Sequence, residues 1–304
     1  MNPAPDFIRK GRNSNLGWRC VVVESQCKIS CSGNYLIVRN EQVKKIHLSE
    51  ICYLMIASTN VSLTGVALCE LAKQNIKVVF CDEKHNPYGE IMPYYGSHNC
   101  SKRIKKQINW HANLKDEINL LIIKRKILNQ AKLLYKLSFD DRAKMLEEYA
   151  DSVIKNDETN REGHSAKVYF NTLFGQEFSR QIDSNVNSAL NYGYTVLLSC
   201  INREVVANGC LTQLGMQHCN EFNEFNFSCD LIEPFRIIVD EYVFLNRDRT
   251  FDSEYKHDLI NLLNKRVNLG CERHLHNAIA VSVKSVIDSL DENDVSLLKL
   301  YEFE

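Results

Sequence analysis

The hydrophobic pattern of the first hundred residues is mainly that of β-strands. Apolar runs rich in β-branched residues recur at short intervals between polar breaks such as "CSGN", a pattern typical of strands. Between the last two runs, "VSLTGVALCELAKQN" spaces its apolar residues as a helix packed on a sheet does. The predicted strands are "WRCVVVES", "YLIVRN", "KKIHLS", "ICYLMIAS" and "IKVVFCDE".

From about residue 101 the apolar spacing changes to that of helices. Leu120, Leu121, Ile123, Ile127 and Leu128 form one helical stripe. The other predicted helices are "SFDDRAKMLEEYADSVI", which begins at a Ser/Asp cap, "NSALNYGYTVLLSCINREVVAN", which ends at Asn-Gly, "DLIEPFRIIVDEYVFL", and residues 254–266 and 271–290.

The sequence therefore predicts an α+β protein in which a β-rich N-terminal domain precedes an all-α C-terminal domain. We place the β-rich domain at residues 17–100 and the helical domain at residues 101–304. Residues 1–16 are expected to be a leader or a remnant of cloning, because they lack the apolar centre of a signal peptide.

Composition is ordinary for a folded protein, with 304 residues, 44% of them hydrophobic and 25% charged. The sequence contains no apolar run of about 18 residues, so we predict no transmembrane helix and no membrane partner. None of the twelve cysteines forms a C-x-x-C pair. Reduced thiols in the cytoplasm are therefore expected, rather than disulfides or a zinc site.

The net charge is only −1, but charged residues are distributed unevenly along the sequence. Ten basic and two acidic residues lie between Lys102 and Lys136, which gives this basic window a charge of +8. The segment from Asp288 to Glu304 holds six acids and one lysine. Such asymmetry favours an anionic partner, although a solvated helix face would produce the same pattern.

Candidate chemistry centres on "HCNEFNEFNFSCDLIEPFR", residues 218–236, where Asp230 and Glu233 stand three apart. The stripe of Ile232, Phe235, Val239 and Tyr242 would face the core and leave the two acids on another face. Close carboxylates repel each other unless a cation lies between them. Both acids could also serve as first-turn residues stabilised by the helix dipole.

A third acid, Glu162 in "NREGHSAKVYF", stands at the predicted start of another helix, with Asn160 as a possible cap. Taken alone, Glu162 and His218 each have an ordinary structural explanation. Their order is more specific: Arg-Glu-Gly, a long helix, Gly-x-x-His, and then "DLIEPFR".

This order resembles the CRISPR-associated integrase family, the "Cas-one" catalytic subunit of spacer acquisition. The family's metal ligands fall on Glu162, His218 and Glu233; the last position is Asp in many members. Asp230 matches a nearby family acid. "GWRCVVVE", "HLSEI", "VVFCDE" and "MPYYG" resemble the type II-A branch.

The resemblance implies a metal-dependent DNA endonuclease and integrase. A 3′-hydroxyl of a short DNA fragment would attack a phosphodiester at the CRISPR repeat, with Mg²⁺ or Mn²⁺ bound by Glu162, His218 and Glu233. The sequence agrees with a reaction that needs no nucleotide, because it contains no G-x-x-x-x-G-K-[ST] loop.

Implied partners are double-stranded DNA, a second copy of the chain, the small ferredoxin-like "Cas-two" subunit and further type II-A adaptation proteins. Two alternatives stay open at this point. One is a general repair or junction nuclease that uses the same site. The other is a non-catalytic DNA-binding scaffold whose acids merely cap helices.

Overall fold

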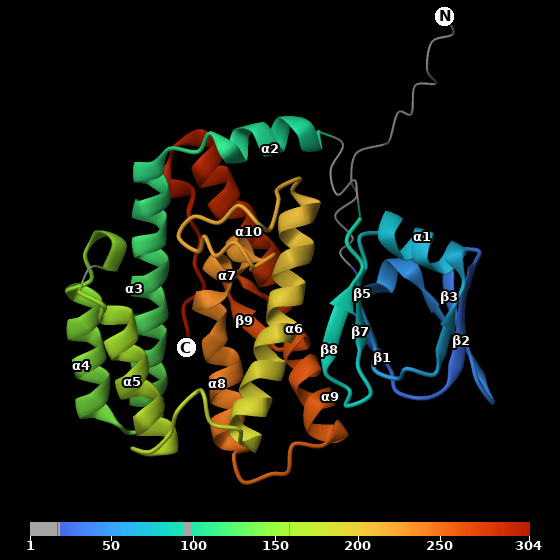
Figure 1. Ribbon diagram of the computed structural model, residues 1–304, viewed down its shortest axis with the longest axis horizontal. Helices are drawn as coiled ribbons and strands as arrows, with labels where there is room; N and C mark the ends of the chain where they lie inside the picture. Colours follow the sequence, from blue (N-terminus) through green and yellow to red (C-terminus); the bar gives the residue numbers. More distant parts are fainter. Residues whose placement is uncertain (1–16, 18, 94–98, 158) are drawn as a thin grey trace, which may run out of the picture.

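The structure is a computed structural model that describes residues 17, 19–93, 99–157 and 159–304. The expected leader, Trp18 of "GWRCVVVE" and the last three residues of "MPYYG" lie outside the described residues. The described part confirms the α+β class, with sheets near the N-terminus and helices after them (Figure 1). None of its helices is long and apolar enough to cross a membrane.

The N-terminal part consists of two four-stranded sheets with helix α1 (Gly65–Lys73) packed beside them (Figure 1). The first sheet has the order β1 (Arg19–Val23), β5 (Ile51–Ile56), β7 (Lys77–Cys81) and β8 (Pro87–Glu90). The second has the order β4 (Val43–His47), β3 (Tyr35–Arg39), β2 (Cys27–Ser32) and β6 (Val61–Leu63), and the short helix η1 (Leu48–Glu50) leads into β5. Our sequence prediction missed β2, β6 and β8.

Strand β5 joins the two halves of the molecule because both of its faces are buried. Leu54 and Ile56 lie in the core of the N-terminal part, whereas Tyr53 and Met55 lie in the core of the helical part. Parallel pairing with β1 and β7 leaves β5 central, so a continuous apolar run suits it.

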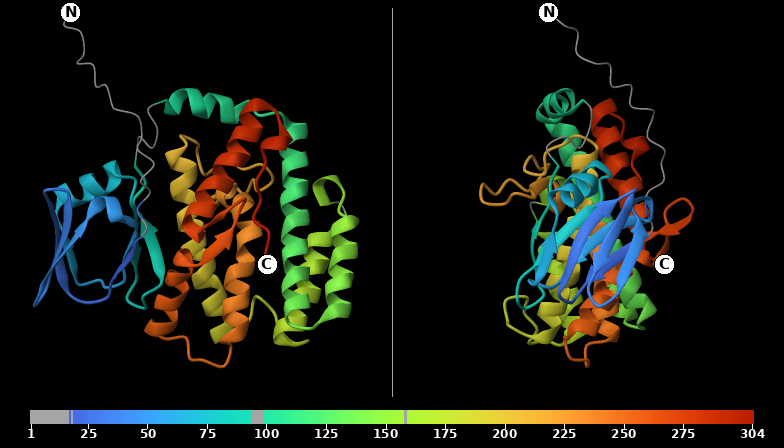
Figure 2. Two further views of the ribbon diagram at one scale, coloured as in Figure 1. Left: turned by 180° about the vertical axis from the view of Figure 1, so that it is seen from behind. Right: turned by 90° about the vertical axis from the view of Figure 1, so that its right-hand side faces the viewer.

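The helical part surrounds a second core and is seen from two further directions in Figure 2. Its longest helix, α3 (Ala112–Lys136), packs against α4 (Asp140–Asp151) and α5 (Arg161–Phe174). The remaining elements are α2 (Cys100–Ile108), η2 (Lys155–Asp157), α6 (Asn185–Ala207), α7 (Asn226–Ile232), η3 (Glu233–Phe235), α8 (Arg236–Leu245), α9 (Ser253–Asn261), η4 (Leu262–Asn264), β9 (Arg266–Asn268), β10 (Glu272–His274), α10 (Leu275–Glu292) and η5 (Val295–Leu297).

Local differences from the predicted helices have identifiable causes. The helix predicted over "DLIEPFRIIVDEYVFL" is interrupted at η3, because Pro234 has no backbone N–H to continue the α-helical ladder. The helices predicted over residues 254–266 and 271–290 are shorter at their facing ends, because residues 266–274 form an antiparallel hairpin that turns at Gly270 with a φ of +75°. The Ser/Asp cap of α4 is wrong: Ser138 has a left-handed φ of 64°, and no side chain caps the helix.

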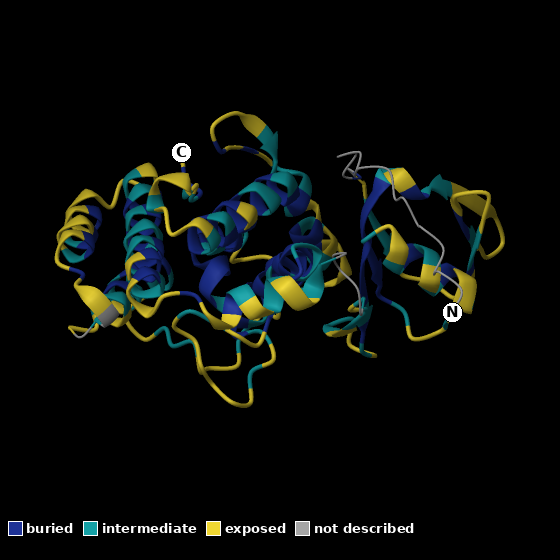
Figure 3. Ribbon diagram, turned by 90° about the horizontal axis from the view of Figure 1, so that it is seen from above, coloured by how far each residue is buried: buried dark blue, intermediate teal, exposed yellow. Residues whose placement is uncertain are grey.

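Burial follows the packing of these elements. Helices α6 and α10 are mostly buried, whereas α2 has one buried residue. Figure 3 shows exposed residues gathered on loops and outer turns, and buried ones inside. No disulfide joins any of the twelve cysteines, all of which lie within the described part of the chain.

Acids of the same chain neutralise most of the basic window, which weakens the argument from charge asymmetry for an anionic partner. Arg103 contacts Asp291, and Arg125 and Lys132 both contact Glu302, at 3.0 and 2.6 Å. The acidic C-terminal segment therefore lies along α2 and α3. Within the described residues, Lys102 and Lys105 form no ion pair.

Candidate active site

The three predicted site residues come from three separate elements. Glu162 lies in the first turn of α5, Glu233 begins η3, and His218 lies on the loop between α6 and α7. Helix α3 packs against both α5 and η3. The two glutamates therefore meet at α3, although 71 residues separate them in the sequence (233 − 162).

A lysine of α3 holds the two glutamates together. Lys126 Nζ lies 2.5 Å from Glu162 Oε1 and 2.6 Å from Glu233 Oε2. Burial alone would lower the pKa of this ammonium, but the charges of Glu233 and Glu162 outweigh burial and raise the pKa. The cation required between close carboxylates is thus, in this structure, the side chain of Lys126.

Glu233 is the more buried of the two, with 8% of its side chain exposed against 34% for Glu162. Arg236 Nη2 lies 3.1 Å from Glu233 Oε1. Burial tends to raise the pKa of Glu233, but Arg236 and Lys126 outweigh it and lower the pKa. Glu233 Oε2 is buried, and its close neighbour is the Lys126 ammonium at 2.6 Å.

Hydrogen bonds and a ring contact hold the backbone of η3, the turn that carries Glu233. Asn129 Nδ2, one helical turn after Lys126, donates to Pro234 O at 2.9 Å and to Tyr301 O at 3.0 Å, and Phe303 N donates to Asn129 Oδ1 at 3.0 Å. The Phe235 and Tyr301 rings stack with centroids 5.4 Å apart. The C-terminal residues thus support the backbone of η3.

Glu162 is positioned by a cap that the sequence analysis did not find. Asp157, not Asn160, accepts the backbone N–H groups of Arg161 and Glu162, each at 2.8 Å. Asn160 occupies the N-cap position with a left-handed φ of 50° and makes no side-chain cap bond. Because Asp157 satisfies the first N–H groups of α5, the carboxylate of Glu162 is left to face Lys126.

His218 is held by Asp230, which is fully buried. Asp230 accepts hydrogen bonds from the backbone N–H groups of Met216 at 2.5 Å, Gln217 at 3.3 Å and His218 at 3.0 Å, and its Oδ1 lies 2.6 Å from His218 Nδ1. The bond to Asp230 raises the pKa of His218, burial opposes the increase, and the charges of Asp230, Glu233 and Glu162 add to it. The imidazole therefore lies within electrostatic range of both glutamates.

Glycine at position 215 has a steric reason. A Cβ there would lie 2.2 Å from His218 O and 3.0 Å from Asp230 Oδ2. The Gly-x-x-His pattern is thus a tight loop folded around the Asp230 carboxylate. Asp230 is a support for His218 rather than a helix cap, which answers the question that the sequence left open for this acid.

The side chain of Arg236 is held in place by Tyr194, which in turn contacts a buried acid. Its guanidinium lies over the ring of Tyr194, 4.7 Å from the centroid. The hydroxyls of Tyr194 and Tyr169 both donate to Asp240. Burial raises the pKa of Asp240 to about 6, in spite of these two donors and the charge of Arg236. Helix α6 thus reaches the site through Tyr194.

The residue types present could hold a divalent cation. The Glu162 and Glu233 carboxylates both face the Lys126 ammonium, and His218 Nδ1 is engaged by Asp230, so Nε2 is the nitrogen that could bind an ion. Within the described residues, no group of three Asp, Glu, His or Cys side chains lies close enough together to hold a metal ion.

Comparison with solved structures shows which known folds this chain is similar to. The fold is similar to that of a protein described as "Casposase bound to integration product", with a TM-score of 0.73, 20% identity, and coverage of 91% of this chain and 92% of that one. It is also similar to a chain of a "Cas6-RT-Cas1--Cas2 complex", with a TM-score of 0.74 and 18% identity, covering 99% of this chain and 38% of that one.

Sequence comparison gives the family. The family described as "CRISPR associated protein Cas1" matches residues 20–263. A CRISPR-associated endonuclease Cas1 of Neisseria meningitidis serogroup C (strain 8013) is 34% identical over 73% of this chain and 74% of its own length. A Cas1 endonuclease of Francisella tularensis subsp. novicida (strain U112) is 22% identical over 77% and 80%. The chain belongs to the Cas1 family of CRISPR-associated proteins, as its resemblance predicted.

The sequence analysis missed Lys126, Asp157 and Asn129. One signal for Lys126 was available, because it lies between Ile123 and Ile127 in the buried stripe of α3. A lysine in such a stripe needs an acidic partner. The identity of that partner depends on a contact across 107 residues (233 − 126), which no local pattern shows.

Proposed function

We propose that this protein is a metal-dependent DNA integrase and endonuclease that inserts short foreign-DNA fragments into a CRISPR array. The observation that carries the proposal is the convergence of Glu162 and Glu233 on one cation position, with His218 within electrostatic range of both. Support comes from membership of the Cas1 family and from relatives described as an endonuclease and as a casposase bound to its integration product.

Glu162, Glu233 and His218 Nε2 would hold Mg²⁺ or Mn²⁺. Oxygen ligands suit either ion, and the imidazole favours Mn²⁺. When bound, such an ion lowers the pKa of an attacking hydroxyl and offsets charge on a phosphoryl centre. With a DNA 3′-hydroxyl as nucleophile the outcome is integration, and with water it is hydrolysis.

The protein's own groups prepare the site for this chemistry. Asp230 fixes the loop and the ring orientation of His218 through four hydrogen-bonded contacts. Arg236 orients Glu233 and adds positive charge where an anionic phosphodiester would approach. Asn129 holds the backbone next to Glu233. These supports confine the ligands before DNA binds, which reduces the reorganisation that the reaction requires.

The proposed partners are double-stranded DNA, a second copy of the chain and the small Cas2 subunit. Similar structures that are described as bound to an integration product and as part of a Cas6-RT-Cas1--Cas2 complex support the DNA and Cas2 partners, whereas the second copy is a prediction from the resemblance. Further type II-A adaptation proteins and a cytoplasmic location remain predictions from the sequence. A repair or junction nuclease would use the same residues on branched DNA, and a scaffold would need none of them.

The test is a strand-transfer assay with a supercoiled plasmid carrying a leader and repeat, short duplex DNA with 3′-hydroxyls, purified Cas2 and Mn²⁺. Glu162→Ala, His218→Ala and Glu233→Ala should each reduce integration by about 10²-fold or more, as expected when preorganised charge stabilisation is removed. Fold and dimer should persist in circular dichroism and size-exclusion chromatography.

Controls separate the alternatives. Glu254→Ala removes an exposed first-turn acid of α9 and should leave integration unchanged. Fragments that end in 2′,3′-dideoxynucleotides should not be integrated. Full integration by Glu233→Ala would overturn the metal assignment and favour a scaffold. Efficient cleavage of branched junctions without any strand transfer would favour the repair nuclease.

A further inference from the structure

Lys126 occupies the position that a divalent ion would need. Its ammonium touches one oxygen of each glutamate, Glu162 Oε1 and Glu233 Oε2, at 2.5 and 2.6 Å. Only 15% of the lysine side chain is exposed, so the ammonium is held between the carboxylates rather than free in solvent. An ammonium and a metal ion cannot both lie at bonding distance from the same two oxygens in the same place.

We propose that Lys126 is a built-in substitute cation: it holds the Glu162–Glu233 pair closed in the metal-free protein and is displaced when the divalent ion binds. This inference rests on the proposed metal-dependent function and adds to it a competitor within the chain. The lysine would keep the carboxylates close together in the absence of metal and would set the concentration of metal at which the site fills.

Two features of the site make the exchange physically reasonable. Lysine has a long flexible side chain with a compact charge, so it can leave through rotation of its side chain while α3 stays in place. Glu162 is the more exposed ligand, with 34% of its side chain accessible, and offers a route to solvent. Arginine at position 236 is bound differently, through Glu233 Oε1 and the Tyr194 ring, and can remain in place.

The geometry of the ion pair agrees with a replaceable partner. The ammonium contacts one oxygen of each carboxylate, Glu162 Oε1 at 2.5 Å and Glu233 Oε2 at 2.6 Å. Attraction between opposite charges depends mainly on distance, so another cation at the same place can supply it. The backbone of η3 is held separately by Asn129, so departure of the lysine does not release Glu233 from its turn.

The variant Lys126→Met removes the charge and keeps much of the volume. Without the competing ammonium, Mn²⁺ affinity should increase by about tenfold or more, because an attraction to two carboxylates no longer has to be broken. In the absence of metal, the same variant should melt at a lower temperature than the wild type, and Mn²⁺ should raise its melting temperature by more. Lys132→Met is the matched control, because Lys132 is on the same helix and pairs with Glu302 outside the site.

The experiment measures Mn²⁺ binding by the electron paramagnetic resonance signal of the free ion, for wild type, Lys126→Met, Lys132→Met and His218→Ala. Tighter binding by Lys126→Met alone supports the proposal. If the wild type binds Mn²⁺ and His218→Ala does not, while Lys126→Met binds no more tightly than the wild type, the metal site stands and the exchange is overturned. Absence of binding in the wild type and in Lys126→Met overturns both.

A second measurement uses the unmodified protein and so does not depend on the variant folding. Reductive methylation, followed by mass spectrometry, reports how fast each lysine reacts. Mn²⁺ should increase the methylation rate of Lys126 several-fold and leave that of Lys132 unchanged. The reason is that displacement moves the Lys126 amine from between the two carboxylates into solvent. An equal or slower rate at Lys126 with Mn²⁺ bound would contradict displacement.

Discussion

Replacing Asp230 by alanine should destabilise the His218 loop without removing any proposed metal ligand. The carboxylate is fully buried and accepts the backbone N–H groups of Met216 and His218 at 2.5 and 3.0 Å, with a longer bond from Gln217. An unsatisfied donor costs about 1–3 kcal/mol. Because Met216 and His218 are only partly covered, water reaches part of the loop, and we expect the unfolding free energy to fall by about 2–4 kcal/mol in total.

The assay is urea denaturation combined with hydrogen exchange at the amides of residues 216–218. Asp230→Asn keeps one acceptor oxygen and should be destabilised less than Asp230→Ala. Asp294→Ala removes an exposed aspartate that caps a short helix and should leave the midpoint close to that of the wild type. Strand transfer by Asp230→Ala should fall but remain above that of Glu233→Ala. The reason is that Asp230→Ala only displaces the His218 imidazole, whereas Glu233→Ala deletes a proposed metal ligand. Wild-type stability and unchanged amide protection in Asp230→Ala would refute this account of the loop.

Four further predictions concern other parts of the molecule. Asn129→Ala should lower the unfolding free energy by about 2–5 kcal/mol, because it leaves buried backbone groups of η3 and of the C-terminal residues unpaired; an unchanged denaturation midpoint would contradict this. Changing Lys102 and Lys105 to Gln together should weaken duplex-DNA binding and reduce the slope of log affinity against log salt by about 0.9 for each DNA phosphate that is no longer neutralised, with an unchanged slope favouring a merely solvated face. Thiol titration of freshly purified, denatured protein under non-reducing conditions should find twelve reactive thiols, and several disulfides would contradict the expected cytoplasmic location. Burial raises the pKa of Asp240 from 3.8 to about 6, so this group's stabilising contribution is fully present below pH 3.8 and disappears as pH rises through about 6; relative to the wild type, Asp240→Asn should gain stability as pH increases from about 4 to about 6 and level off above that, and a pH-independent difference would count against it.

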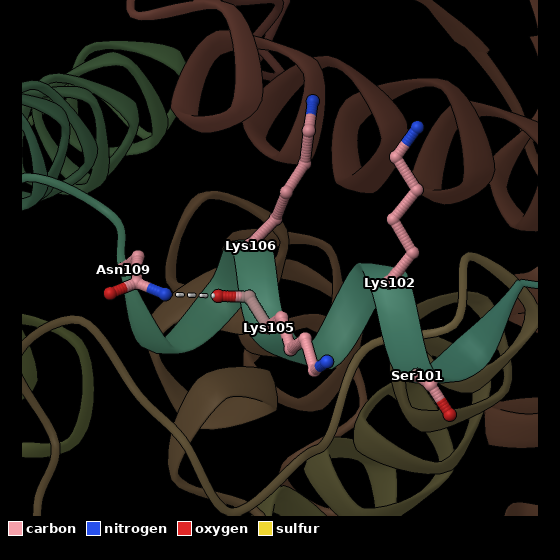
Figure 4. A pocket seen from close by; sticks show the side chains of 5 residues that line it. All are labelled: Ser101, Lys102, Lys105, Lys106 and Asn109. Atoms are coloured by element: carbon pink, nitrogen blue, oxygen red, sulfur yellow. Dashed lines mark hydrogen bonds between the residues drawn. The ribbon is translucent and has the colours of Figure 1, made fainter.

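The choice of Lys102 and Lys105 follows from the surroundings of α2. Figure 4 shows the Lys102 and Lys106 side chains extending to one side of the helix and Lys105 to the other, around a hollow also lined by Ser101 and Asn109. Lys106 lies 3.7 Å from both Asp291 and Glu292. Removing Lys106 would therefore disturb the C-terminal acids, whereas changes at Lys102 and Lys105 break no ion pair found in the described residues.

Much of the fold was predictable because local patterns determine it. The apolar run of β5 and the Asn-Gly end of α6 need only local sequence to be recognised. The hairpin at residues 266–274 was missed because its strands have three residues each, too few to show an alternating pattern. Asp157 was missed as a cap because it lies four residues before Arg161, beyond the usual N-cap position.

The candidate site was predictable only in part. Family resemblance named Glu162, His218 and Glu233, whereas each of them taken alone had an ordinary structural explanation. The structure gives Asp230 a role in holding His218 and shows Lys126 between the glutamates. Both facts depend on contacts between distant segments, which periodicity and local propensity do not report.

The most direct test of the central claim is a crystal structure of the protein grown with Mn²⁺, measured at a wavelength where manganese scatters anomalously. The account predicts an anomalous peak bounded by Glu162, His218 Nε2 and Glu233, within direct bonding distance of all three, with the Lys126 ammonium moved away from both carboxylates. A structure at saturating Mn²⁺ that shows no peak there, with Lys126 still between the two glutamates, would contradict it.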